Sequence, residues 1–236
     1  MKVGVVVGLD PETNVLDKFK NCIANGMDNC QLVCWELSSF TDEKADEINK
    51  AVEETKMEIT ALWCGWEGPK AWNFTEGPLL LGLVPSSYRA NRIKNLQDGS
   101  DFAKKIHVKN LITHVGFLPE NPMDTKYHET VAAVRAVLDR CKANGQNFLF
   151  ETGQETPITL KRIIEDLGKE NLGINIDPAN LLLYGKANPV DALDIFGEYV
   201  MGVHAKDGEY PTDGMNLGEE KALGKGRVNF ELFVKK

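Results

Sequence analysis

Short apolar runs alternate with amphipathic stretches along most of this chain. The runs are rich in β-branched and aromatic residues, as in buried strands; they are Val3–Val7, Asn29–Cys34, Glu58–Trp63, Lys109–His114, Asn147–Glu151, Leu172–Asp177 and Tyr199–His204. Between them apolar residues recur at helical spacing, in Glu12–Ala24, Asp42–Lys56, Tyr88–Lys105, Thr125–Asn144 and Pro157–Leu167. Because strands and helices alternate throughout, the pattern predicts an α/β fold with a parallel sheet and right-handed crossovers.

The ends of the apolar runs favour a (β/α)8 TIM barrel over a doubly wound open sheet. Polar or aromatic residues gather at these ends, namely Trp35-Glu36, Trp63, His114, Glu151, Asp177 and His204. A barrel brings all its strand ends to one mouth, whereas an open sheet uses only the crevice at its switch point. The sequence after the first run reads GLDPET and lacks the dinucleotide-binding Gly-x-Gly-x-x-Gly. We therefore predict a single TIM-barrel domain over residues 1–236.

The pattern contains seven strand-like runs and no eighth. The last residues, NFELFVKK, are typical of the opening turns of a seventh helix. A seven-stranded barrel leaves its first and last strands as unpaired edges of a buried parallel sheet, which is costly. We expect a barrel that lacks strand 8 and the C-terminal helix. Truncation of a longer product is the favoured explanation, and a degenerate barrel that closes in another way is the alternative.

Composition and charge narrow the range of partners. The chain has 42% apolar and 26% charged residues, an ordinary globular composition, and a net charge of −8. This charge argues against nucleic acid or an anionic membrane as the main partner. There is no apolar run of about 18 residues and no signal-peptide pattern. The five cysteines lack C-x-x-C spacing, which favours reduced thiols. We expect a cytoplasmic protein, with assembly into a homo-oligomer left open.

Three polar side chains close successive apolar runs. Glu151 ends QNFLFE, Asp177 ends LGINID and His204 ends YVMGVH. In a barrel, three consecutive strands bring these residues to the same rim, within reach of one ion. Two carboxylates and an imidazole suit Mn²⁺, Zn²⁺, Co²⁺ or, less well, Mg²⁺. Alone, Glu151 is also compatible with a helix cap or a loop, Asp177 with the start of a turn, and His204 with a hydrogen-bonded rim position. Their joint placement predicts a site for one divalent metal ion.

Other residues near the strand ends are candidates for substrate binding. The loop after the third run is long and aromatic, and it forms either a pocket wall or a small core of its own. We favour the pocket wall, with Trp63 and Trp66 as contacts and Trp66 as the first choice. His114 is predicted to form a hydrogen bond with the substrate. In ALGKGRVNF, backbone N–H groups and Arg227 offer a weak signal for a phosphate or a hydroxyl-rich ligand.

Four segments carry a resemblance to a known family: FETGQETPITL, GINIDPANLLLYG, VHAKDG and GKGRVNF. The sequence resembles the xylose isomerase-like barrel proteins described as sugar phosphate isomerases and epimerases. This superfamily includes tagatose/psicose 3-epimerases, hydroxypyruvate isomerases, inosose dehydratases and isomerases, and endonuclease IV. The resemblance implies a TIM barrel with one divalent metal at its mouth, held by Glu, Asp, His and Glu on strands five to eight. Glu151, Asp177 and His204 match the first three ligands, and the fourth has no counterpart.

The resemblance also bears on the residues beside these ligands. Many relatives carry Asp-x-x-His on strand six, with the His touching substrate; Asn180 stands at that place, so an amide contact is expected. Lys206 and Asp207 match the His-x-Lys-Asp motif of inosose-type enzymes. They are expected to contact the substrate or to support the ligands, for example with Asp207 holding the imidazole or a metal-bound water. A solvated surface pair is the alternative.

The activity implied is that of a metal-dependent sugar or sugar phosphate isomerase or epimerase in carbohydrate metabolism. Proton transfer next to a carbonyl would pass through a metal-stabilised enediolate, with Glu151 as both ligand and base. Without the strand-eight Glu, the chain as written is expected to bind metal weakly and to turn over poorly or not at all. An inosose-type dehydratase or isomerase acting on a cyclitol is one alternative, and a non-catalytic sugar-binding barrel is another. Net charge and the small number of well-placed histidines disfavour a DNA repair enzyme.

Overall fold

A computed structural model describes residues 2–168 and 170–236. Its main sheet has seven strands, hydrogen-bonded in chain order. They are β1 (Val5–Leu9), β2 (Asn29–Cys34), β3 (Glu58–Cys64), β4 (Asn110–Thr113), β5 (Asn147–Glu151), β6 (Leu172–Ile176) and β7 (Val200–Val203). The predicted α/β class with a parallel sheet in the strand order of a TIM barrel is confirmed. Among the described residues this sheet has no eighth strand.

Helices lie between the strands, and one follows the last strand. They are α1 (Val15–Ala24), α2 (Asp42–Thr55), α3 (Gly77–Leu80), α4 (Ser86–Lys105), α5 (Thr125–Ala143), α6 (Pro157–Leu167), α7 (Pro178–Leu183), α8 (Pro189–Phe196) and α9 (Phe230–Lys235), with short 3₁₀ turns η1 (Leu37–Ser39) and η2 (Gly197–Tyr199). A small antiparallel hairpin pairs β8 (Asp207–Gly208) with β9 (Glu220–Lys221). No helix in the described part of the chain is long and apolar enough to cross a membrane.

The chain divides into two compact units. The first comprises Met1–Glu67, Asn91–Thr113 and Val137–Phe148, and the second comprises Gly68–Ala90, His114–Ala136 and Leu149–Lys236. The expectation of a single domain over residues 1–236 stays a prediction.

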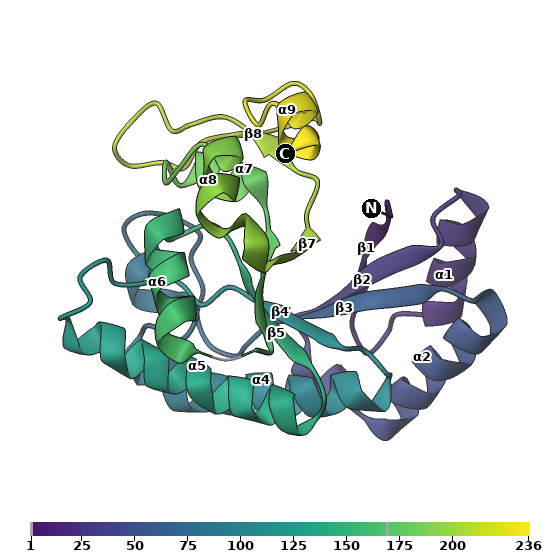
Figure 1. Cartoon of the computed structure of the whole chain (residues 1–236). Coiled ribbons are helices and arrows are strands. Elements are labelled where there is room, and N and C mark those ends of the chain that lie inside the picture. The colour runs from purple at the N-terminus through teal and green to yellow at the C-terminus, as the bar shows by residue number, and fades with distance from the viewer. Residues whose placement is uncertain (1, 169) are drawn as a thin grey trace. The chain divides into compact units, whose positions relative to one another are not determined.

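The first unit is built on β1, β2 and β3, which run parallel. Val7 lies opposite Leu32, and Leu32 lies opposite Leu62. All three side chains are buried, so these strands form an apolar core. Helices α1 and α2 pack side by side in this unit (Figure 1). The Thr41 side chain caps the start of α2 by accepting the Lys44 N–H at 3.1 Å.

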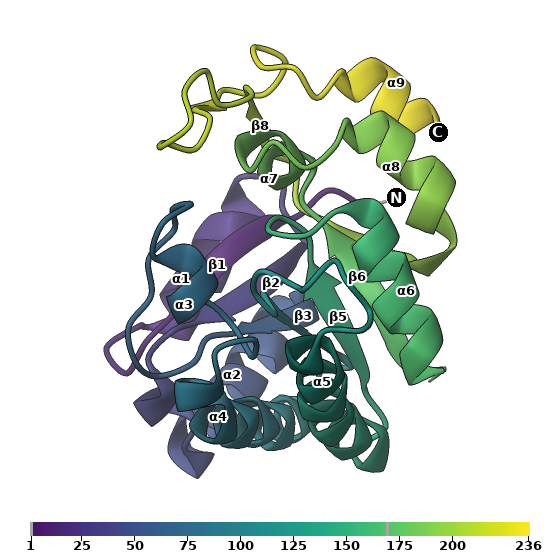
Figure 2. The same ribbon diagram turned by 90° about the vertical axis from the view of Figure 1, so that its left-hand side faces the viewer.

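The second unit holds β6 and β7 with the helices that follow β5. Helix α8 contacts both α6 and α9 (Figure 2). Helices α6 and α8 begin in the same way. The side chains of Thr156 and Asn188 cap them, and a proline follows each cap. Strand β6 is buried along its whole length, and its last residue Ile176 pairs with Val203 of β7. The strand ends that carry the predicted ligands therefore belong to this unit.

Candidate metal centre

The three predicted metal ligands come together in the second unit. Glu151 is the last residue of β5, Asp177 follows β6 directly, and His204 follows β7 directly. One ligand atom from each side chain lies within 4.8 Å of the other two. The parallel strands bring this about, because the His204 N–H donates to the Ile176 carbonyl at 2.9 Å and so continues the ladder between β6 and β7.

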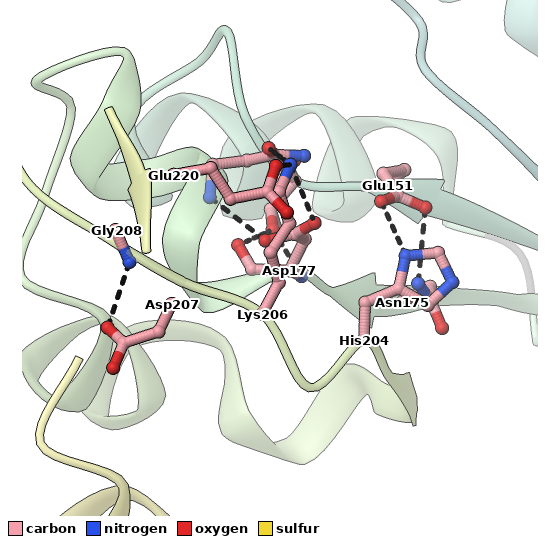
Figure 3. A network of polar contacts seen from close by, with 10 residues as sticks. Glu151, Asn175, Asp177, His204, Lys206, Asp207, Gly208 and Glu220 are labelled. Carbon is pink, nitrogen blue, oxygen red and sulfur yellow. Dashed lines mark hydrogen bonds and ion pairs between the residues drawn. The ribbon is translucent and has the colours of Figure 1, made fainter. Parts of the chain in front are cut away.

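Glu151 is buried and both of its carboxylate oxygens have partners (Figure 3). Oε1 lies 2.8 Å from His204 Nδ1. Oε2 accepts a hydrogen bond of 3.2 Å from the Asn175 side-chain amide, which is completely buried. Asn175 was not predicted as a site residue. The sequence pattern could have indicated this residue, because Asn175 lies two positions before Asp177 on a strand and therefore points to the same face.

Asp177 serves as the cap of α7. Its Oδ1 accepts the backbone N–H of Asn180 at 2.9 Å. The Thr152 hydroxyl accepts the Asp177 N–H at 2.8 Å and donates to the Asp177 carbonyl at 2.9 Å, which ties the ends of β5 and β6 together. Where a turn start was the alternative, the structure has a helix cap, which is compatible with a ligand role because Oδ2 has no part in it. Burial, with the nearby charge of Glu151, raises the pKa of Asp177 despite the opposing effect of Lys206.

The electrostatics of the cluster favour a cation. Burial opposes a charge on the His204 imidazole, but the hydrogen bond to Glu151 and the charges of Glu151 and Asp177 outweigh it, so the pKa of His204 is raised. The imidazole and the two carboxyl groups thus lie close together in a buried setting, where a positive charge is favoured. A divalent ion would supply that charge, and a donor set of two carboxylates and one imidazole fits Mn²⁺, Zn²⁺, Co²⁺ or Mg²⁺.

Lys206 forms a second group of contacts beside the cluster (Figure 3). Lys206 Nζ donates to Asn180 Oδ1 at 2.9 Å and lies 3.3 Å from Glu220 Oε2 and 3.8 Å from Asp177 Oδ2. The Asn180 amide nitrogen donates to the Thr152 carbonyl at 3.2 Å. Lys206 is thus held next to a predicted ligand. Substrate contacts by Lys206 and Asn180 stay predictions.

Asp207 holds the glycine-rich loop. Its buried carboxylate accepts four backbone N–H groups at 2.9–3.1 Å, from Gly208, Gly224, Gly226 and Val228. These N–H groups form a concave anion site that the Asp207 carboxylate fills itself. This arrangement argues against the expectation that Asp207 contacts His204 or a substrate, and against phosphate binding by these N–H groups. The Arg227 side chain is exposed, and its backbone N–H donates to Gly208.

His114 lies against the metal-ligand cluster in the second unit. Its side chain is 6% exposed, and burial lowers its pKa to about 4, partly offset by the charge of Glu151. The imidazole is therefore neutral near pH 7 and able to form hydrogen bonds without carrying charge. An added Cβ at Gly153, in the loop after Glu151, would lie 3.5 Å from the His114 ring. The predicted substrate hydrogen bond of His114 stays a prediction.

The two tryptophans predicted as substrate contacts lie in the first unit and are buried. Trp63 is 5% exposed and Trp66 is 1% exposed. The Trp66 ring lies 4.8 Å from that of Trp35, and the Arg92 guanidinium stands 4.9 Å from the Trp66 ring. This burial argues against the predicted sugar contacts and favours the alternative, a packing role. No periodicity in this loop distinguishes the tryptophans that face solvent from those that are buried.

Comparison with known proteins identifies the family to which this chain belongs. The sequence profile of the xylose isomerase-like TIM barrel matches residues 19–236. The chain belongs to the xylose isomerase-like TIM barrel family. A solved family relative, a xylose isomerase domain protein from Planctomyces limnophilus, is 31% identical with a TM-score of 0.90; the match covers 98% of this chain and 82% of that one. No curated protein matches the chain.

More distant solved structures share the fold of this xylose isomerase-like chain. A D-tagatose 3-epimerase-like protein has a TM-score of 0.72 at 17% identity, and the match covers 99% of this chain and 85% of that one. A xylose isomerase-like TIM barrel protein from Mycobacterium smegmatis, in complex with magnesium, has a TM-score of 0.70 at 14% identity, with the same coverage of 99% and 85%.

Proposed function

We propose that this protein is a divalent-metal-dependent sugar isomerase or epimerase. Glu151, Asp177 and His204 are its metal ligands. The observation that carries the proposal is the convergence of their ligand atoms within 4.8 Å, at the ends of three neighbouring parallel strands. The magnesium bound to the Mycobacterium smegmatis relative and the epimerase-like neighbour support it.

Both reactions remove a proton from a carbon next to a carbonyl. A divalent ion bound by the three residues would polarise that carbonyl and the neighbouring hydroxyl. Glu151 accepts the proton, while Asn175 fixes the orientation of its carboxylate through the 3.2 Å hydrogen bond to Oε2. Lys206, held 3.8 Å from Asp177, supplies a positive charge near the developing oxyanion. The neutral His114 imidazole forms a hydrogen bond with a substrate hydroxyl.

The surroundings of the site favour an unphosphorylated sugar. Phosphate groups are commonly bound by converging backbone N–H groups. The N–H groups of Gly224, Gly226 and Val228 all donate to Asp207. Lys206 has Asn180, Asp177 and Glu220 as partners. The N–H groups of the glycine-rich loop and the Lys206 ammonium group therefore already have partners within the protein. A neutral ketose or cyclitol suits the site better than a sugar phosphate.

Metal binding is the first test of the proposal. Mn²⁺ should raise the melting temperature of the wild-type protein, because a ligand that binds only the folded state stabilises it. The variants Glu151→Gln and His204→Ala should lose this increase, with metal affinity reduced about a hundredfold or more. His128→Ala removes an exposed histidine of α5 and should retain the full increase. Equal Mn²⁺ affinity of all four proteins would refute the metal assignment.

The reaction is tested by hydrogen exchange at carbon. D-tagatose, D-fructose and L-ribulose are incubated with the Mn²⁺-loaded protein in D₂O and followed by NMR. An isomerase or epimerase incorporates deuterium next to the carbonyl and forms the isomeric sugar. A dehydratase acting on 2-keto-inositol would instead release water and form an unsaturated ketone. Because slow turnover is expected without a fourth ligand, exchange is followed for hours at saturating Mn²⁺. Binding without any exchange for every substrate would then indicate a sugar-binding barrel and sink the enzymatic proposal.

A further inference from the structure

One tryptophan of the second unit differs from the others in its exposure. Trp72, in the connection between β3 and α3, has 40% of its surface exposed, whereas Trp63 and Trp66 are almost fully buried. The exposed part of the ring is apolar area that gains free energy when a ligand covers it.

Trp72 lies one side chain away from the candidate metal centre. Its ring centroid is 5.1 Å from that of His114, with the two planes inclined at 60°. The His114 imidazole in turn interacts with the backbone of Glu151 and with the charge of the Glu151 carboxylate. In space, His114 therefore lies between the exposed ring of Trp72 and the predicted metal ligand Glu151.

The chain next to Trp72 is firmly anchored. The Asn73 side chain accepts the backbone N–H groups of Thr75, Glu76 and Gly77 at 3.1, 2.7 and 3.2 Å. Phe74 packs edge-on against the Tyr184 ring, with centroids 6.1 Å apart. Ordering a binding loop costs free energy, so a ring that is already held in place binds more tightly than a mobile one.

We propose that the sugar bound at the metal centre stacks its C–H face on Trp72, which makes this residue a determinant of substrate specificity. The inference deepens the proposed function and rests on it. A sugar has an apolar face of C–H groups and an edge of hydroxyls. The exposed indole offers an apolar surface for the first, and the neighbouring His114 and the metal ligands offer polar groups for the second.

The test uses Trp72→Ala and Trp72→Phe, with D-tagatose, D-fructose and L-ribulose as probes in the presence of Mn²⁺. Stacking contributes equally to ground-state and transition-state binding, so Trp72→Ala should raise Kd and KM about tenfold and leave kcat within about twofold. Trp72→Phe keeps an aromatic face and should fall between wild type and Trp72→Ala. Leu79→Ala removes another exposed apolar side chain, from α3 in the same connection, and should leave Kd unchanged.

Mn²⁺ affinity and melting temperature are measured for each variant, and both should match wild type. If the variants turn over the sugars with wild-type KM and Kd, the role of Trp72 is refuted while the proposed function stands. If the sugars bind with the predicted order of affinities but show no proton exchange, the enzymatic proposal fails and the stacking role stands. A wild-type protein that binds none of the three sugars saturably would overturn the stacking role as well.

Discussion

At the scale of single residues, Glu155 is a buried acid whose ionisation should destabilise the folded protein. It is 4% exposed and lies between β5 and α6, where its Oε1 accepts the Gly153 N–H at 3.3 Å. Burial raises its pKa to about 7, although backbone N–H groups and Lys186 act in the opposite direction. The folded state therefore keeps a proton that the unfolded chain releases between about pH 4.5 and pH 7, and stability falls as the pH rises through this window.

Glu155→Gln should remove this pH-dependent loss. At about pH 4.5 the carboxylic acid and the amide are both neutral and similar in shape, so the two proteins should differ little. At about pH 8 the variant should be more stable by up to about 3 kcal/mol, the linkage value of the shifted pKa. Urea denaturation at both pH values measures the difference. Glu165→Gln, at an exposed position of α6, is the control. A Glu155→Gln effect independent of pH would contradict the assignment.

The same scale shows how far single residues could be assigned from sequence. Glu151, Asp177 and His204 were recognisable because each is the first ionisable residue after an apolar run, and parallel strands end together. The substrate contact of Trp66 stays a prediction, and its burial could not be foreseen, since a loop has no periodicity that separates a buried ring from an exposed one. Asp207 was placed on the correct segment, but its four backbone partners lie 1 to 21 residues away in the chain and leave no local signature.

At the scale of elements, the segment that carries His204 and Lys206 continues into β8 and is fastened by Asp207. An added Cβ at Gly226 would collide with Asp207 Oδ1 and with the Gly208 backbone. Gly226→Ala should therefore break at least two of the four hydrogen bonds and destabilise the protein by about 1–3 kcal/mol. Because His204 lies on the same segment, Mn²⁺ affinity should also fall. Chemical denaturation and calorimetric Mn²⁺ titration measure the two effects.

The hairpin offers a matched control for this substitution. An added Cβ at Gly214 meets no atom within 4 Å, so Gly214→Ala should change stability by less than about 0.5 kcal/mol and leave Mn²⁺ affinity unaltered. Wild-type Mn²⁺ binding by a destabilised Gly226→Ala protein would separate the loop from the metal centre and limit Asp207 to a structural role.

Elements with a clear period were predictable and the others were not. The seven strands and the long helices follow from runs of apolar residues and from helical spacing. Helix α7 has all six residues buried, so it lacks the polar face that marks an amphipathic helix. Strands β8 and β9 have two residues each, too few for an alternating pattern, and their pairing depends on the Asp207 network.

At the scale of the whole molecule, the two compact units raise the question of whether the chain unfolds as one domain. The predicted metal ligands all belong to the second unit. In a single cooperative domain, a ligand bound anywhere raises the free energy of global opening everywhere. Hydrogen–deuterium exchange with and without Mn²⁺ distinguishes a single cooperative domain from two units that unfold separately.

We expect the slowest-exchanging amides of β2 and β3 in the first unit to gain the same protection from Mn²⁺ as those of β6. At a metal concentration about a hundred times Kd, the gain is about 2.7 kcal/mol for every amide that exchanges only by global unfolding. The His204→Ala protein should show no gain in either unit, which excludes unspecific effects of the ion. Protection confined to β6 and its neighbours would mean that the units unfold separately, and the single-domain prediction would then be wrong.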